Sequence, residues 1–180
     1  MTTENILTIL NSIHNDLKMV KEVVYDKCGF ELTNLKQNIE SVEYGACSFV
    51  LNGKTIQQRI SKITPTKTGQ FVTIWKRNND GITSPFDSSD TIDFVIITAR
   101  SGDNFGQFIF PKQVLADKGI IAHNGKEGKR GIRVYPPWDI APNKQAEKTQ
   151  RWQTKYFLLI KKDNSTDINL AKQLFISNQD

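Results

Sequence analysis

The sequence predicts a single α+β domain spanning residues 1–180, with a central, mainly antiparallel sheet between a long N-terminal helix and C-terminal helices. Three observations support this class. The chain has 180 residues with 38% hydrophobic and 24% charged content, which suits one packed domain. Apolar residues recur at helical spacing near both ends. Short β-rich runs separated by Gly, Asn and Asp fill the middle.

The N-terminal segment predicts a helix over residues 3–25. Its apolar residues recur at spacings of three and four, which places them on one face: Ile6, Leu7, Ile9, Leu10, Ile13, Leu17, Val20, Val23 and Val24. Gly29 is a suitable stop for this helix. Leu32, Leu35 and Ile39 then predict a second, short helix before Tyr44.

Strands are expected from residue 47 onward. Residues 47–51 and 55–63 flank Asn52-Gly53, a dipeptide typical of a tight hairpin turn. Further strands are predicted over 71–75, 94–98, 107–110 and 132–135, with loops at 78–90 and 124–131. Short connections favour antiparallel neighbours. After the prolines at 136, 137 and 142, helical spacing returns over 144–161 and again over 168–175.

Basic charge is concentrated in two stretches of the chain. Residues 54–77 and 111–162 hold eighteen of the 24 Lys and Arg residues but four of the 19 Asp and Glu residues, within a net charge of +5. Such segregation favours a surface that meets phosphates, because neutralising a polyanion releases its condensed counterions. The sequence therefore predicts nucleic acid, DNA or RNA, as the partner. An acidic protein partner is the alternative.

The first basic stretch contains KITPTKTGQFVTIWKR at residues 62–77, which predicts a hairpin with a Thr-Pro-Thr-Lys-Thr-Gly turn. Lys62 and Lys67, the hydroxyls of Thr64 and Thr66, and the turn amides could converge on a phosphate. The alternative is structural. Threonine favours strands, and the two lysines would then be solvated.

The second basic stretch offers two more candidate sites. Pro111 is expected to begin a short helix with Lys112 in its first turn, beside free amides that suit an anion or simply start a connecting helix. Lys129, Arg130 and Arg133 precede Tyr135 and Trp138, so phosphate and base contacts could lie together. The two rings could instead pack the proline-rich turn. Basic residues also recur on the helix that follows, a pattern usual for a solvated face: Lys144, Lys148, Arg151, Lys155 and Lys162.

Motifs for known catalytic chemistries are incomplete. The chain has no P-loop, GxGxxG or GxSxG, and no carboxylates followed by a strand-borne Lys as in PD-(D/E)xK nucleases. The catalytic residues are therefore unknown, and the prediction leans toward a protein that is not an enzyme. A metal-dependent nuclease using Glu43, Asp93 and Asp103 is the enzymatic alternative. Cys28, Cys47, His14 and His123 lack metal-ligand spacing, so no metal or cofactor is expected.

The chain resembles the MepB family of bacterial proteins. The resemblance rests on residues 44–49, 62–77, 106–112 and 131–138, and covers about residues 44–159. It implies a stress or multidrug-resistance setting, since such proteins occur beside a MarR-type repressor and a multidrug efflux transporter. It also implies a core similar to that of restriction endonucleases. It assigns no catalytic residue.

The remaining expectations concern location and assembly. No basic n-region precedes an apolar segment at Met1, and no uncharged apolar run approaches the ~20 residues of a membrane span. We therefore expect a soluble cytoplasmic protein that does not bind membranes, present as a monomer or weak dimer.

Overall fold

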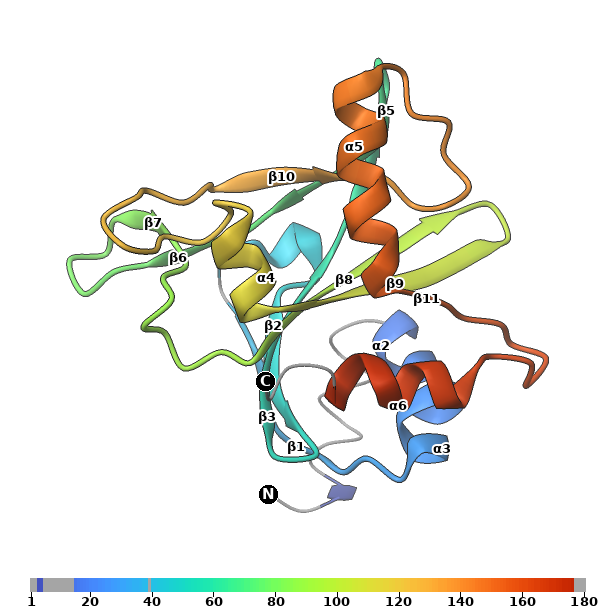
Figure 1. Ribbon diagram of the computed structural model, residues 1–180. Helices are drawn as coiled ribbons and strands as arrows, with labels where there is room; N and C mark the ends of the chain where they lie inside the picture. The colour runs from blue at the N-terminus through green and yellow to red at the C-terminus, as the bar shows by residue number, and fades with distance from the viewer. Residues whose placement is uncertain (1–2, 5–14, 39, 177–180) are drawn as a thin grey trace.

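The computed structural model describes residues 3–4, 15–38 and 40–176 (Figure 1). Its main sheet has six strands. Their order is β1-β2-β3-β8-β9-β11. They span Leu32–Gln37 (β1), Cys47–Leu51 (β2), Lys54–Ile60 (β3), Phe94–Ser101 (β8), Asn104–Pro111 (β9) and Phe157–Leu159 (β11). Neighbours are antiparallel except β3 and β8, which run parallel. The predicted α+β class with a mainly antiparallel sheet is confirmed.

Two smaller sheets lie beside the main one. The first has the order β10-β5-β4, and the second pairs β6 with β7. Their strands span Lys62–Thr64 (β4), Lys67–Thr73 (β5), Trp75–Arg77 (β6), Thr83–Pro85 (β7) and Gly131–Val134 (β10). The strand predicted over 55–63 is thus divided between two sheets. Ser61 marks the crossing, where its buried hydroxyl donates to Gln70 Oε1 (2.7 Å) and its amide donates to the Thr98 carbonyl (2.9 Å).

Both predicted hairpin turns are present. Asn52 and Gly53 have φ values of +48° and +80° and join β2 to β3 with Leu51 opposite Lys54. Positive φ at both central positions belongs to the tight turn that matches the twist of the two strands. The β4–β5 hairpin also forms, with Thr64 opposite Lys67. We call residues 62–69 the basic hairpin.

The N-terminal helical segment is continuous from Asn15 to Cys28. It comprises α2 (Asn15–Val20), the π-helical turn η1 (Lys21–Tyr25) and α3 (Asp26–Cys28), and it ends at Gly29 with φ of +72°. The remainder of the helix predicted over 3–25, residues 5–14, lies outside the described residues. Gly29 acts as the expected stop because glycine adopts the left-handed conformation without steric cost.

The short helix predicted over 32–39 is wrong, because this segment is the edge strand β1. Leu32 and Leu35 are both buried although three residues separate them, a spacing that suggested a helix. A β-bulge explains it: the register with β2 shifts between Thr33 and Lys36, and Asn34 has φ of +54°. The extra residue returns the second leucine to the buried face. Ile39 lies outside the described residues.

Four helical segments follow later in the chain. They are α4 (Lys112–Asp117), α5 (Lys144–Gln153), the 3₁₀ turn η3 (Thr154–Tyr156) and α6 (Ile168–Ile176); another 3₁₀ turn, η2, spans Val42–Tyr44. The helix predicted over 144–161 is too long, because the chain becomes extended at Phe157. Phe157 and Leu158 are buried in different clusters on opposite faces of the sheet, which is the two-residue period of a strand.

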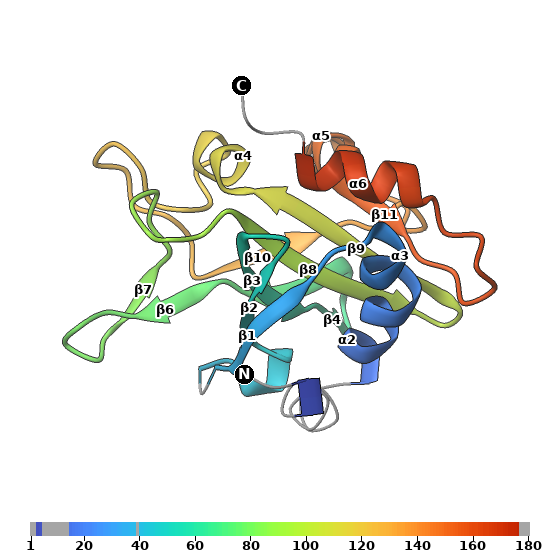
Figure 2. The ribbon, with the colours of Figure 1, turned by 90° about the horizontal axis from the view of Figure 1, so that it is seen from below.

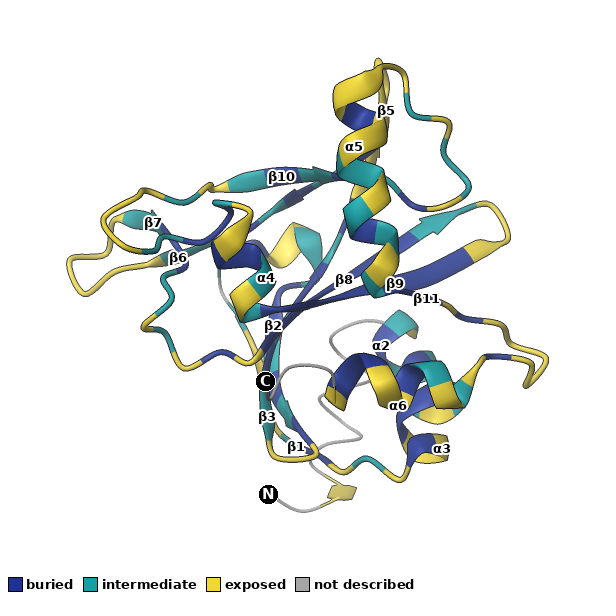
Figure 3. Cartoon of the chain, viewed as in Figure 1, coloured by how far each residue is buried: buried dark blue, intermediate teal, exposed yellow. Residues whose placement is uncertain are grey.

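Two clusters of buried hydrophobic residues lie on opposite faces of the main sheet. Figure 2 shows the helices around the sheet from below, and Figure 3 marks the buried residues in dark blue. Helical segments α2, η1, α3 and α6 cover one face, where Tyr25 and Phe175 pack on Phe49 and Phe94. On the other face, α4, α5 and the strands β5 and β10 pack over residues such as Phe108. Strand β5 of the first basic stretch and α4, β10 and α5 of the second therefore lie on this side.

Arg59 joins the main sheet to β6 from a buried position. It is 2% exposed, and its Nη1 donates to the Gln58 carbonyl (2.8 Å) while Nη2 lies 3.5 Å from the Trp75 carbonyl. Its guanidinium carbon lies 5.7 Å from the centre of the Phe86 ring. Burial lowers the pKa of Arg59 to about 10, so the side chain stays charged at neutral pH.

Within the described part of the chain, no helix combines the length and apolar character that a membrane crossing requires.

Candidate functional site

A groove of about 540 Å³ is lined by residues of α4, β10, α5 and the segments beside them. We call it the basic groove. Four of its lining side chains are basic and one is acidic; the lining residues are Asp117, Lys118, Ile120, Lys129, Gly131, Ile132, Arg133, Tyr135, Gln145, Lys148, Thr149, Trp152 and Gln153. Two aromatic side chains share this lining. Cationic and aromatic groups together suit a ligand with both negative charge and a flat ring.

Helix α5 forms one wall of the groove. Asn143 caps its first turn, with its side-chain oxygen accepting from the Ala146 amide at 2.9 Å. Lys148 and Trp152 are four residues apart, so they share the face that lines the groove. The Trp152 ring packs on Phe110 with centroids 5.3 Å apart, which fixes the angle of the helix against the sheet.

Two glutamines dock α5 on the neighbouring chain. Gln153 is 1% exposed; its Oε1 accepts from the Tyr135 amide (2.8 Å) and its Nε2 donates to the Arg133 carbonyl (3.1 Å), so its amide group pairs with the outer edge of β10. Gln150 donates to the carbonyls of Pro136 (2.9 Å) and Asp139 (2.8 Å). These bonds hold α5, one wall of the groove, against β10 and the residues that follow it.

Tyr135 directly follows β10, and its ring lies against Gly69. A Cβ atom at position 69 would come within 2.8 Å of the ring carbons Cδ1 and Cε1, so only glycine permits this approach. Gly69 also has φ of +82°, which disfavours other residues. Its amide donates to the Asp139 carboxylate; partial burial raises the pKa of that group, and this hydrogen bond opposes the rise. Tyr135 is therefore held between the groove and the basic hairpin.

Arg133 connects the groove to the basic hairpin. Its Nη1 donates to the carbonyl of Gly69 (3.0 Å) and the hydroxyl of Thr64 (3.1 Å), and it also approaches the carbonyls of Lys67 and Thr68. These contacts pin the turn to β10, which pairs with β5. The remaining hairpin candidates are exposed on the basic hairpin: Lys62, Thr66 and Lys67, with the Lys62 ammonium 4.4 Å from the Tyr44 ring centre.

The loop before β10 and helix α4 supply the other wall. Gly128 packs so closely on residues 120–122 that a Cβ would lie 2.6 Å from the Ile120 carbonyl oxygen and the Ala122 amide nitrogen. The Lys129 amide donates to that same carbonyl (2.8 Å), which directs Lys129 to the groove. Lys118, just after α4, lies with its ammonium 5.5 Å from the Trp152 ring centre.

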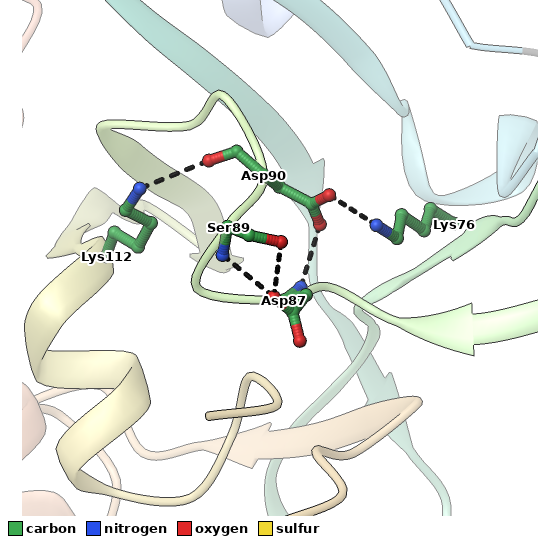
Figure 4. Close-up of polar contacts among 5 residues, drawn as sticks. All are labelled: Lys76, Asp87, Ser89, Asp90 and Lys112. Carbon is green, nitrogen blue, oxygen red and sulfur yellow. Dashed lines mark hydrogen bonds and ion pairs between the residues drawn. The ribbon is translucent and has the colours of Figure 1, made fainter. Parts of the chain in front are cut away.

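Three predicted site residues lie elsewhere. Lys112 donates to the Asp90 carbonyl (3.1 Å), beside an ion pair between Lys76 and the Asp90 carboxylate (Figure 4). Arg130 bonds Glu127 (3.1 Å) and the Thr83 carbonyl (3.2 Å). The Trp138 ring packs on Phe157 with centroids 5.5 Å apart. These engagements give the three side chains structural roles outside the groove.

Asp90 is the centre of the small network in Figure 4. Its carboxylate accepts from the Asp87 amide (2.8 Å), and Asp87 in turn accepts from the Ser89 hydroxyl (2.6 Å) and amide (2.8 Å). These two bonds from Ser89 lower the pKa of Asp87. The network stabilises the loop between β7 and β8, and Lys112 ties α4 to that loop.

The acids considered for a metal site are not brought together. Asp93 immediately precedes β8 and accepts from the Thr55 amide (2.8 Å), whereas Asp103 lies in the turn after β8. An eight-residue strand is about 26 Å long, so these two carboxylates cannot share one ion. Among the described residues, no three His, Cys, Asp or Glu side chains form a cluster able to hold a metal.

The comparisons with known proteins agree with the resemblance noted from the sequence. The MepB-like family matches residues 38–159. The chain belongs to this family. A solved structure, the crystal structure of MepB, is 32% identical, with a TM-score of 0.71 over 81% of this chain and 97% of that chain.

A second solved structure, the bacterial homing endonuclease I-Ssp6803I, is 12% identical with a TM-score of 0.40 over 77% of this chain and 89% of that chain. Among curated proteins, no significant match was found. The comparisons therefore establish the MepB-like family and its fold without assigning an activity.

The structure thus brings together three of the ten predicted site residues in the basic groove: Lys129, Arg133 and Tyr135. The groove also contains Lys118, Trp152 and Gln153, which sequence reasoning did not select. Lys148 was noted only as part of a solvated stripe. The sequence did indicate that Lys148 and Trp152 lie together, because they are four residues apart on a predicted helix and must share a face.

Proposed function

We propose that this MepB-like protein binds nucleic acid through the basic groove. The observation that carries the proposal is the lining itself, in which four cationic side chains meet Tyr135 and Trp152 in one concavity with a single acid, Asp117. Cationic side chains neutralise phosphates, and aromatic side chains provide faces on which bases stack.

The basic hairpin extends this surface. Lys62 and Lys67 are exposed on the two strands of this hairpin, which Arg133 and Gly69 hold beside Tyr135. In the proposal, the groove takes part of the nucleic acid, and the hairpin lysines contact neighbouring phosphates. Thr64 and Thr66 would then contribute hydroxyl contacts to the same backbone, as threonine does in many nucleic-acid complexes.

The biological setting is part of the same proposal. The family resemblance supports a stress or multidrug-resistance role, and the composition supports a cytoplasmic protein. Neither rests on the geometry of the groove. A metal-dependent nuclease is the weaker alternative, because Asp93 and Asp103, two of its three candidate ligands, lie at opposite ends of β8.

The test measures the fluorescence anisotropy of labelled oligonucleotides over a range of salt concentrations. Lys129→Glu combined with Lys148→Glu should weaken binding and reduce the salt slope by about two, roughly one unit for each phosphate contact removed. Gel analysis of the same mixtures after addition of Mg²⁺ reports any cleavage.

A matched control carries the same change in net charge. Lys36→Glu combined with Lys172→Glu alters exposed lysines on β1 and α6, away from the groove, and should leave the salt slope nearly unchanged. If both double variants weaken binding equally, the groove is not the site. If the wild-type protein does not bind at low salt but retains an acidic protein partner, nucleic acid is the wrong ligand.

A further inference from the structure

The dimensions of the basic groove limit which form of nucleic acid can enter it. Its volume of about 540 Å³ falls within the range of small-molecule sites, roughly 300–1,000 Å³. Helix α5 bounds one side, and Lys118 and Lys129 lie on the other. The major groove alone of a DNA duplex is about 12 Å wide, so a whole duplex could contact only the rim. A single nucleotide, in contrast, matches the space.

The aromatic side chain best placed to receive a base is Tyr135. Gly69 supports one side of its ring, and the side chain also lines the groove. The bonds from Gln153 to the backbone at Arg133 and Tyr135 fix the same segment from the α5 side. Stacking on a ring held in this way costs little side-chain entropy. Bases within a duplex are already stacked on one another, whereas those of a single strand are free to stack on protein.

Lysines from both walls line the groove together with Tyr135. Lys148 projects from α5, while Lys118 and Lys129 belong to the opposite wall. A nucleotide whose base stacks on Tyr135 would place its flanking phosphates within a ring of positive charge. The contacts concern phosphates and one flat ring face, so they discriminate poorly among base sequences.

We propose that the basic groove is selective for single-stranded over double-stranded nucleic acid, taking one nucleotide against Tyr135 with its phosphates on Lys118, Lys129 and Lys148. This inference rests on the proposed function of the groove. It adds the strand form of the ligand and the residue that recognises it.

The first test compares a labelled single strand with a duplex of equal length, using wild-type protein at one salt concentration and both deoxyribo- and ribo-oligonucleotides. The single strand should bind at least about tenfold more tightly. Tyr135→Ala should weaken single-strand binding by about tenfold without changing the salt slope, because no charge is lost. Tyr135→Phe keeps the ring and should bind like wild type.

Acetylation of surface lysines, read by mass spectrometry, gives a second measurement on the wild-type protein should Tyr135→Ala fail to fold. A bound single strand should protect Lys118, Lys129 and Lys148 but not Lys172 on α6. A duplex should protect the groove lysines less.

Equal or tighter binding of the duplex would overturn strand selectivity while leaving nucleic-acid binding by the groove intact. Unchanged single-strand affinity of a folded Tyr135→Ala variant would overturn the assigned role of the ring. If the wild-type protein binds neither the duplex nor the single strand, the proposed function is overturned as well.

Discussion

Replacing Gly69 with alanine tests the contact that holds Tyr135. At φ of +82°, an alanine costs about 1–2 kcal/mol in backbone conformation alone. The new Cβ would also lie 2.8 Å from the Tyr135 ring and 2.9 Å from the Val134 carbonyl oxygen, so the surroundings must move. Overpacking of this kind adds about 1–3 kcal/mol. The total predicted loss in the free energy of unfolding is about 2–5 kcal/mol.

Gly53→Ala is the matched control, because Gly53 has φ of +80° and a Cβ added there would have no atom within 4 Å. It should lose only the conformational part, about 1–2 kcal/mol. Urea unfolding followed by tryptophan fluorescence measures both variants. Since Gly69→Ala displaces Tyr135, it should also weaken nucleic-acid binding, whereas Gly53→Ala should not. Equal losses of stability in the two variants would refute the close packing of the Tyr135 ring on Gly69.

Three further predictions concern stability, each measured by urea unfolding. Gln153→Ala leaves two backbone groups at the edge of β10 without their partner and should lower the free energy of unfolding by about 2–5 kcal/mol. Its control, Gln145→Ala, changes an exposed residue of the same helix and should alter stability by less than about 0.5 kcal/mol. Similar losses in the two variants would argue against docking by Gln153. Asn143→Ala removes the cap of α5 and should cost about 1 kcal/mol, while Asn143→Ser, which still accepts the Ala146 amide, should retain most of it. Burial raises the pKa of the Cys47 thiol from 9.0 to about 12, so stability is unaffected below pH 9 and should fall as the pH rises toward 12, because the unfolded thiol ionises first. Cys47→Ala should show a shallower alkaline decline, and an unchanged decline would assign the effect to other groups.

Local chemistry explains which parts of the fold could be predicted. Asn52-Gly53 specifies its own hairpin because both positions need positive φ, and Gly29 ends a helix for a similar reason. Leu32 and Leu35 misled the prediction because a bulge gave a strand the spacing of a helix. The end of α5 was also missed, since pairing of Phe157 with Phe108 depends on residues far away in the chain.

In the candidate site, too, residues close together in the sequence could be predicted, and those that depend on distant contacts could not. Lys129, Arg133 and Tyr135 were recognised because they are close together in the sequence, around one short strand. Lys118 was not selected because it reaches the groove only when α4 packs beside β10 and α5. Gln153 gave no signal, because a glutamine that pairs with a strand edge looks like any polar residue on a helix until the strand is placed.

Strands β3 and β8 are parallel neighbours in the main sheet, although residues 61–93 lie between them in the chain. That intervening segment contains β5, which must later pair with β10 some sixty residues further on. Closing both connections loses chain entropy before any contact compensates for it, which slows folding. Strand β10, which contributes Gly131, Ile132 and Arg133 to the basic groove, is in place only after it has paired with β5. During refolding, recovery of ligand binding should therefore lag behind the appearance of secondary structure, and binding would report the completion of the fold.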